Sequence, residues 1–113
     1  MSCIFCQIAQ HEVSANIVHE DDHVIVFNDL FPQAPVHMLI VPKTHYSTLN
    51  DIPPEDTTGF SLMHRVAAKL AHDRGFADKG YRLTLNCNRD GGQSVYHVHM
   101  HLLAGRPLLW PPG

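Results

Sequence analysis

The segment His97-Val98-His99-Met100-His101-Leu102-Leu103 decides the fold expected for this chain, because histidine and apolar residues alternate along it. A strict period of two is typical of a half-buried β-strand, in which successive side chains point to opposite faces of a sheet. The three imidazoles would share one face, and Val98, Met100 and Leu102 would share the other. The sequence therefore predicts a strand held in a core by its apolar face, with a row of histidines opposite.

The chain around this segment has 113 residues, of which 44% are hydrophobic and 17% charged. These values predict one domain, residues 1–113, with an ordinary core. A net charge of −3 argues against a nucleic-acid partner, which needs a basic surface. The absence of a long apolar run and the short uncharged N-terminus favour a soluble, cytoplasmic protein with no membrane partner. Three cysteines suit a reducing compartment better than a disulfide framework.

The remaining patterns predict an α+β fold built on an antiparallel sheet. A short helix is expected over residues 3–10, and the clearest helix is expected to open at Pro53-Pro54 and to stop at Gly75, with an apolar stripe at helical spacing. Strand patterns precede and follow that helix, which favours hairpin-connected antiparallel strands. The expected strands cover residues 17–20, 23–28, 36–41 and 81–88 and the histidine segment, with a turn at 89–92.

Three interpretations of the histidine row are open from spacing alone. A neutral imidazole can attack phosphorus and form a covalent intermediate, while its neighbours orient it and stabilise the phosphoryl oxygens. Alternating histidines can instead converge on one metal ion, as His-x-His pairs do in zinc sites. The third interpretation is a set of polar residues on the solvent face of an edge strand, which the in-register apolar alternation disfavours.

A glycine-rich turn, Gly91-Gly92-Gln93-Ser94, lies directly upstream of the histidine segment. Glycine lets a backbone approach a ligand closely, and successive backbone N–H groups can form an anion-binding concavity. Taken alone, such a turn is more typical of a plain β-hairpin. Beside a histidine row it favours phosphoryl transfer, because it supplies donors for phosphoryl oxygens next to a nucleophile.

Several separated motifs together resemble the histidine triad (HIT) superfamily, over essentially the whole chain. The histidine segment is preceded by Gly-Gly-Gln-Ser-Val-Tyr and followed by Gly105-Arg106-Pro107. The segment 92–103 and the Trp-Pro-Pro-Gly end are most similar to the Hint-like purine nucleoside phosphoramidase branch. The resemblance implies a HIT fold, with an antiparallel sheet, one long helix and a short N-terminal helix, in a homodimer that forms a continuous sheet. Further matches in order are at residues 4–5, 28–29, 32–37, 40–43 and 81–83.

The same resemblance implies a reaction and assigns residues to it. His99 would attack the α-phosphorus of an adenosine or guanosine 5′-phosphoramidate, and water would hydrolyse the nucleotidyl-histidine to the nucleoside monophosphate. No cofactor would be required, and the partner would be a purine nucleotide substrate. The implied catalytic residues are His99, His101, His97, His37 and Ser94, the last beside the leaving amine. The implied substrate-binding residues are Asp29 at the ribose, Asn86 and Gln93 at phosphate or ribose, Gly92 and Trp110, and Phe27, Asn28, Leu30, Ile4, Phe5 and Ile8 around the base.

Cys3-Ile4-Phe5-Cys6 has the spacing of two ligands of one zinc ion. The sequence holds no second C-x-x-C, so zinc would need two histidines from elsewhere. Some bacterial HIT proteins resemble this chain in such a pair, which implies a structural zinc held by Cys3, Cys6, His45 and His97. The alternative from the residues alone is two half-buried thiols, and Cys87 is expected to be a small apolar residue in a strand.

Two other functions stay open beside the phosphoramidase. One is a dinucleoside polyphosphate hydrolase of the Fhit-like type, against which Ser94 and the Trp110 end argue. The other is a zinc-bearing nucleotide-binding or interaction module with little turnover. Trp110 itself is expected either to reach the neighbouring subunit's active site, as the resemblance implies, or to pack on its own subunit.

Overall fold

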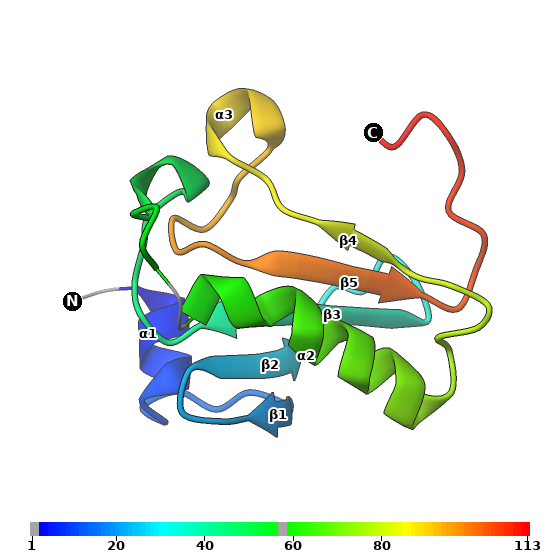
Figure 1. Ribbon diagram of the computed structural model, residues 1–113, viewed down its shortest axis with the longest axis horizontal. Helices are drawn as coiled ribbons and strands as arrows, with labels where there is room; N and C mark the ends of the chain where they lie inside the picture. Colours follow the sequence, from blue (N-terminus) through cyan, green and yellow to red (C-terminus); the bar gives the residue numbers. More distant parts are fainter. Residues whose placement is uncertain (1–2, 57–58) are drawn as a thin grey trace.

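The computed structural model describes residues 3–56 and 59–113. Its centre is a five-stranded sheet with the order β1-β2-β3-β5-β4, in which every neighbouring pair is antiparallel (Figure 1). The expected α+β class is confirmed. The strands are β1 (Ile17–Glu20), β2 (Val24–Asn28), β3 (Val36–Pro42), β4 (Arg82–Thr84) and β5 (Met100–Ala104). The helices are α1 (Ile4–Ala9), α2 (Gly59–Arg74) and α3 (Asn88–Gly91), with a single 3-10 turn, η1 (Leu49–Asp51).

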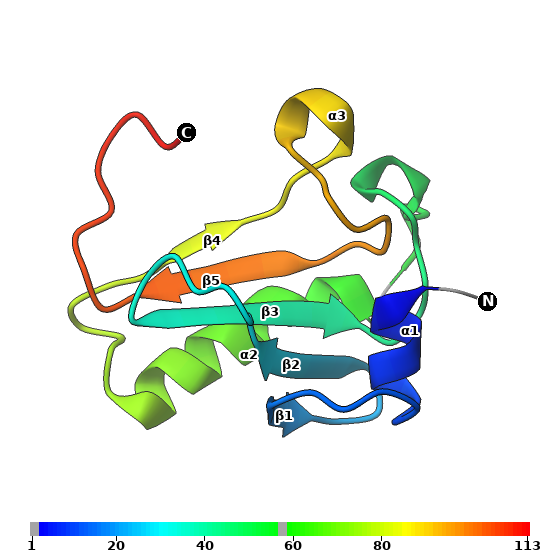
Figure 2. The ribbon, with the colours of Figure 1, turned by 180° about the vertical axis from the view of Figure 1, so that it is seen from behind.

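The two faces of the sheet carry different side chains, as the period of two predicts. The apolar stripe of α2 packs on one face, in a buried cluster that includes Val98 and Leu102. On the other face, Phe5 and Ile8 of α1 pack in a second buried cluster with side chains of β2 and β3. Figure 1 shows α2 in front of the sheet, and Figure 2 shows α1 from behind, at the end of β3. The histidines alternate with Val98 and Leu102 and therefore lie toward α1.

The long helix has the predicted stripe but not the predicted start. It begins at Gly59, after the Pro53-Pro54 pair that was expected to open it. A proline disfavours the helical conformation of the residue before it, so the first proline of the pair cannot readily begin a helix. The carboxylate of Asp56 accepts the backbone N–H of Phe60 and so caps the first turn. Residues 57–58 of the predicted helix lie outside the described residues. The buried residues of the helix are Gly59, Met63, Val66, Ala67, Leu70 and Ala71.

The strand predicted over residues 81–88 is shorter in the structure, because the chain reverses direction sooner. β4 ends at Thr84, and α3 stands where a simple turn was expected. Asn88 has a φ of 61°, and Gly92 closes α3 in the left-handed region with a φ of 81°. Glycine adopts that region without strain, which explains the residue type at this position. Figure 1 shows α3 raised away from the sheet.

The histidine strand is also shorter than predicted, because the last residue of its partner strand β3 cannot extend the ladder beyond the pair Ile40–Met100. β5 begins at Met100, so His97 and His99 precede the regular strand. β3 stops at Pro42, which has no N–H to extend a ladder. The carbonyl of Pro42 accepts the Nε2–H of His97 at 2.8 Å, which occupies the group that a longer ladder would use. The alternation of sides continues beyond the end of the regular hydrogen bonding.

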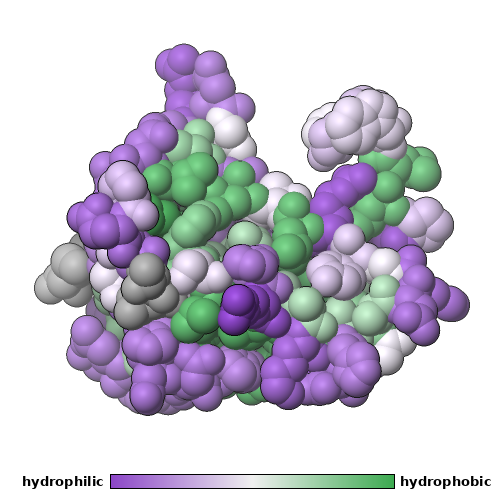
Figure 3. Space-filling view, in the orientation of Figure 1, coloured by the Kyte–Doolittle hydropathy of each residue, from purple (hydrophilic) through white to green (hydrophobic). Residues whose placement is uncertain are grey.

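The C-terminal residues after β5 form an extended tail. Arg82 holds it by donating from Nη2 to the carbonyls of Leu108 and Leu109, at 3.0 and 3.1 Å. Trp110 is 83% exposed. Figure 3 shows this end projecting from the body, with a hollow between it and α3. No helix within the described residues is long and apolar enough to span a bilayer.

Candidate active site and metal centre

A pocket of about 350 Å³ opens on the α1 face of the sheet. A volume of this size is typical of a small-molecule site. The residues expected from the sequence that line it are Ile4, Phe5, Ile8, Phe27, Asn28, Asp29, Leu30, Ser94, His99 and His101. The sequence did not single out Ser14, Ala15, Asn16, Phe31, Leu39 and Val95, which also line it. Phe31 adjoins predicted residues in the sequence, whereas the segment 14–16 reaches the pocket only through the path of the chain between α1 and β1.

Asn86, Gly92, Gln93 and Trp110 are not among the residues that line this pocket. Gln93 is buried, and its amide bonds the backbone instead. Its Nε2 donates to the carbonyls of Ser47 and Val95, at 2.7 and 3.1 Å, and its Oε1 accepts the N–H of Asn88 at 2.9 Å. Gln93 therefore braces the loop that leads into the histidine segment.

His99, on the pocket wall, has one ring nitrogen in a fixed hydrogen bond. Its Nδ1 lies 2.8 Å from the backbone carbonyl of His97. A carbonyl can only accept, so Nδ1 carries the ring hydrogen. Burial lowers the pKa of His99, which keeps the ring neutral at neutral pH. The lone pair of a neutral ring then lies on Nε2, so His99 is arranged as a nucleophile through that atom.

Asp29, His37 and His101 form a second group, here called the acidic histidine cluster. The backbone N–H of Gln33 donates to Nδ1 of His37 at 3.0 Å, so a neutral His37 ring carries its hydrogen on Nε2. That Nε2 lies 2.9 Å from Nδ1 of His101 and 3.4 Å from Oδ2 of Asp29. Nδ1 of His101 is therefore an acceptor, and the ring hydrogen of His101 is on Nε2.

The rings of the acidic histidine cluster are neutral at neutral pH. Burial lowers the pKa of His37, although the charge of Asp29 opposes this. Burial lowers the pKa of His101 to about 4, with a smaller contribution from the neighbouring His99 and His37. A pKa this low means that His101 donates a hydrogen bond as a neutral imidazole and not as a cation.

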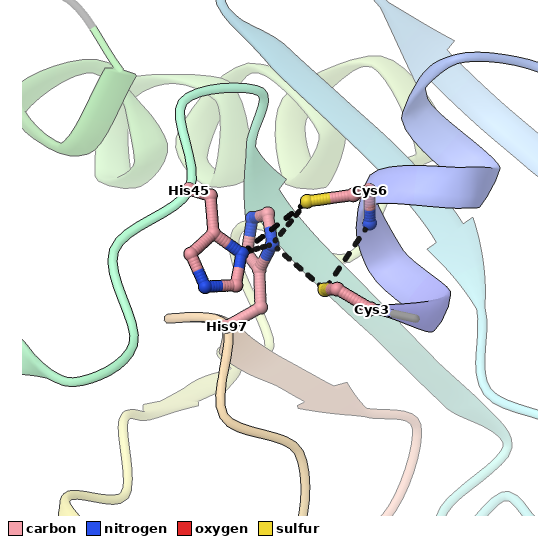
Figure 4. Close-up of side chains that lie close together, drawn as sticks. All are labelled: Cys3, Cys6, His45 and His97. Carbon is pink, nitrogen blue, oxygen red and sulfur yellow. Dashed lines mark hydrogen bonds between the residues drawn. The ribbon is translucent and has the colours of Figure 1, made fainter. Parts of the chain in front are cut away.

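Cys3, Cys6, His45 and His97 converge at the N-terminal end of α1, and we call them the cysteine–histidine cluster (Figure 4). Cys3 is the N-cap of α1, and the three-residue spacing to Cys6 brings both thiols to one side. His45 comes from the loop after β3, and His97 from the approach to β5. Burial, reinforced by Cys3, raises the pKa of the Cys6 thiol to about 11. Burial lowers the pKa of His97 to about 4, so its ring is neutral, as a ligand must be.

The cysteine–histidine cluster fits a tetrahedral zinc ion. Nδ1 of His97 lies 3.4 Å from Sγ of Cys3, 3.5 Å from Sγ of Cys6 and 3.0 Å from Nδ1 of His45. Zinc bonds to sulfur and nitrogen imply ligand separations of roughly 3.3–3.8 Å in a tetrahedron, so both distances to sulfur match and the distance between the two nitrogens is slightly short. Nε2 of His97 donates to the carbonyl of Pro42, which leaves Nδ1 free to bind a metal. Zinc here would link α1 to the histidine segment and stabilise both.

The acidic histidine cluster also brings three ligand atoms within 4.8 Å of one another, but its hydrogen bonds do not suit a metal. The N–H of Gln33 occupies Nδ1 of His37, so Nε2, the atom that faces His101 and Asp29, carries the hydrogen. A metal on that Nε2 would require a fully deprotonated ring or the loss of the bond from Gln33. This cluster is therefore suited to hydrogen bonding with a substrate.

Comparisons with known proteins agree with this geometry. The HIT domain family model matches residues 10–108. The chain is 50% identical over 105 residues to the purine nucleoside phosphoramidase of Escherichia coli, covering 93% of this chain and 88% of that protein. The crystal structure of a HIT family hydrolase from Legionella pneumophila superposes with a TM-score of 0.96 at 48% identity, covering 99% of this chain and 100% of that one.

A further relative bears on the metal. A zinc-bound histidine triad family protein from Mycobacterium smegmatis superposes with a TM-score of 0.80 at 32% identity, covering 94% of this chain and 76% of that one. A family model that spans most of the sequence, and relatives at half identity over nearly all of it, leave no ambiguity of fold or ancestry. The chain belongs to the HIT domain family.

Proposed function

We propose that this protein hydrolyses purine nucleoside 5′-phosphoramidates to the nucleoside monophosphate, with His99 as the nucleophile. The observation that carries the proposal is the free Nε2 lone pair of a neutral His99 at the wall of a pocket of about 350 Å³. The 50% identity to a protein named purine nucleoside phosphoramidase supports the choice of substrate.

The reaction proceeds in two displacements at phosphorus. Nε2 of His99 attacks the α-phosphorus, a bond from phosphorus to this nitrogen forms, and the bond to the leaving amine breaks. The leaving amine takes up one proton from solvent through the hydroxyl of Ser94, which lines the same pocket, while the Nε2–H of His101 donates a hydrogen bond to a phosphoryl oxygen. Water then attacks phosphorus, the bond to His99 breaks, and the proton that water loses passes to solvent, so one proton is taken up and one is released over the two displacements.

The pocket walls suit a nucleoside. Phe5, Ile8 and Phe27 are buried apolar residues at one side, where a purine base can lie. Asp29 has a half-buried carboxylate at the end of β2, and its Oδ1 already accepts the N–H of Phe31 at 2.8 Å. Its Oδ2 provides the acceptor for ribose hydroxyls.

His97 contributes through both its backbone and its side chain. Its backbone carbonyl fixes the hydrogen of His99, while its side chain belongs to the cysteine–histidine cluster. Zinc held by that cluster would supply a structural link between α1 and the histidine segment and would take no part in the displacements. Loss of zinc is therefore expected to lower stability before it changes the chemistry.

The protein acts as a homodimer in this proposal, with β4 and α2 at the contact between subunits. β4 is an edge strand of the five-stranded sheet, so a second copy can pair with it and extend the sheet. The exposed side chain of Trp110, on the tail beside β4, is then available to the neighbouring subunit's pocket. Sedimentation velocity tests the dimer, and Trp110→Ala is expected to alter the preference among substrates.

The test of the function is hydrolysis of a fluorogenic adenosine 5′-phosphoramidate by the wild type, by His99→Ala and by the control His72→Ala, whose ring is 86% exposed on α2. We expect turnover by the wild type and the control, and none by His99→Ala, while AMP still binds. Each assay is run with zinc and with a chelator, and diadenosine polyphosphate serves as the competing substrate. Equal turnover by His99→Ala would contradict the assignment, and faster cleavage of the diadenosine compound would move the protein to the other hydrolase class.

A further inference from the structure

The hydrogen of His101 is fixed by a series of bonds that begins at a backbone group. The N–H of Gln33 can only donate, and it lies 3.0 Å from Nδ1 of His37. His37 in turn donates from Nε2 to Nδ1 of His101 at 2.9 Å. Each ring has one hydrogen when neutral, so the donor at Gln33 decides which nitrogen of His101 is protonated.

Gln33 lies in an exposed loop between β2 and β3, and Arg106 holds it there. The guanidinium donates from Nε and from Nη2 to the carbonyl of Gln33, at 3.1 and 3.0 Å. Its Nη1 donates to the carbonyl of Pro107 at 3.0 Å, which fixes the fork itself. Two donors on one carbonyl restrain both the position and the direction of that residue.

The residue before Arg106 brings the loop close. Gly105 has a φ of +96°, and a Cβ at this position would lie 2.8 Å from Cβ of Pro35. Only glycine allows so close an approach with that backbone conformation. The chain just after β5 therefore contacts the loop at both Gln33 and Pro35, four and two residues before His37.

We propose that Arg106 is a positioning residue, which holds Gln33 so that the ring hydrogen of His101 stays on Nε2. In its catalytic consequence this inference rests on the proposed function, because the Nε2–H of His101 is the hydrogen-bond donor toward the phosphoryl group. Arg106 itself does not line the pocket, so its effect reaches the substrate only through Gln33, His37 and His101.

The test compares Arg106→Met with Arg89→Met. Both arginines are exposed, and Arg89 is bonded to Asp90, its neighbour in the sequence. Protein labelled with nitrogen-15 in histidine reports which ring nitrogen carries hydrogen, and His37→Gln assigns the signals. We expect wild type and Arg89→Met to show hydrogen on Nε2 of His37 and His101, and Arg106→Met to show a mixture of the two neutral forms.

The kinetic readout separates positioning from folding and from binding. For Arg106→Met we expect kcat to fall by about tenfold to a hundredfold, as for a misaligned hydrogen-bond donor to the transition state, with KM little changed. Arg106→Lys keeps the charge but not the two-donor fork, so we expect it to restore only part of kcat. Gly105→Ala, which displaces the loop at Pro35, is expected to shift the histidine signals in the same direction.

The outcomes are distinguishable. Wild-type histidine signals in Arg106→Met would overturn the inference, whatever the enzyme hydrolyses. A mixed histidine population with an unchanged kcat would overturn its catalytic part. If the wild type does not cleave the phosphoramidate, the proposed function fails, and the nitrogen-15 spectra still decide whether Arg106 sets the hydrogen of His101.

Discussion

The cysteine–histidine cluster and the acidic histidine cluster lie on the same side of the sheet, and each contains a buried, neutral imidazole, His97 in the first and His37 in the second, yet they suit opposite tasks. Behind His97 stands an acceptor, the carbonyl of Pro42, which takes the ring hydrogen and leaves a lone pair facing the thiols. Behind His37 stands a donor, the N–H of Gln33, which places the hydrogen on the inner nitrogen. The backbone group behind a histidine thus decides whether the ring binds a cation or donates to an anion.

The largest expected effect is the loss of metal from the first cluster. In Cys6→Ser we expect zinc content to fall from about one per chain to none, because a thiolate ligand is gone. With free zinc a thousandfold above its dissociation constant, the free energy of unfolding should fall by about 4 kcal/mol relative to wild type. Urea denaturation with zinc and with a chelator measures this difference. Cys87→Ser, outside the cluster, is the control. If the free energy of unfolding of the wild type did not depend on zinc, the assignment of the cluster as a zinc site would be contradicted.

The next largest effect is expected from the acidic histidine cluster. It concerns the rate of catalysis and not the stability of the fold. His101→Ala removes the Nε2–H donor, so kcat should fall by about a hundredfold or more. Zinc content should not change, because His101 is absent from the first cluster. Steady-state kinetics and metal analysis on the same preparation measure both quantities. Loss of zinc in this variant would show that the clusters are not independent.

The pH dependence of stability offers a subtler test. An unfolded chain takes up a proton at His101 near pH 6.5, whereas in the folded protein burial lowers the pKa of that ring to about 4. The unfolded state binds more protons between these values, so the free energy of unfolding decreases as pH falls through that window. In metal-free protein, His101→Gln should reduce the slope by up to about one proton. A slope identical to that of wild type, measured from urea midpoints, would argue against a neutral buried ring.

The Asp29→Asn substitution is expected to leave the number of bound metal ions unchanged, which is the smallest effect of the series. Cobalt titration should show one equivalent in wild type and in Asp29→Asn, since the acidic histidine cluster does not suit a metal. The same variant should raise KM by about tenfold through the loss of a charged acceptor. If the wild type bound a second equivalent of cobalt and Asp29→Asn did not, the conclusion that the acidic histidine cluster does not suit a metal would be contradicted.

Local patterns were enough for much of the fold and for part of the site. The alternation in the histidine segment predicted its two faces, because a period of two needs only one strand, and the stripe of α2 was read in the same way. The place where β5 begins could not be read locally, because it depends on β3 ending at Pro42. Resemblance supplied His37 and His45, which lie far from the histidine segment in sequence.

The positions of the ring hydrogens in the site could not be predicted from the sequence. Every residue other than proline has a backbone N–H, so nothing marks Gln33 as the donor to His37 until the loop is folded. The same holds for Arg106. Its guanidinium donates to the backbone carbonyl of Gln33, and every residue has such a carbonyl, so the sequence does not mark the partner. For Gln93, the sequence predicted a contact with substrate, and it could not predict the bonds that the amide makes to the backbone of Ser47 and Asn88.

The contact between Cys3 and His97 also determines when the ligands of the cysteine–histidine cluster can come together during synthesis of the chain. These two residues lie 94 positions apart, so the first thiol leaves the ribosome long before its imidazole partner exists. A growing chain can offer a metal only two sulfur ligands and, later, His45, and closing so long a loop is slow. The full set of four ligands therefore exists only once nearly the whole chain has been made, so a metal ion would be bound at this site after synthesis and not during it.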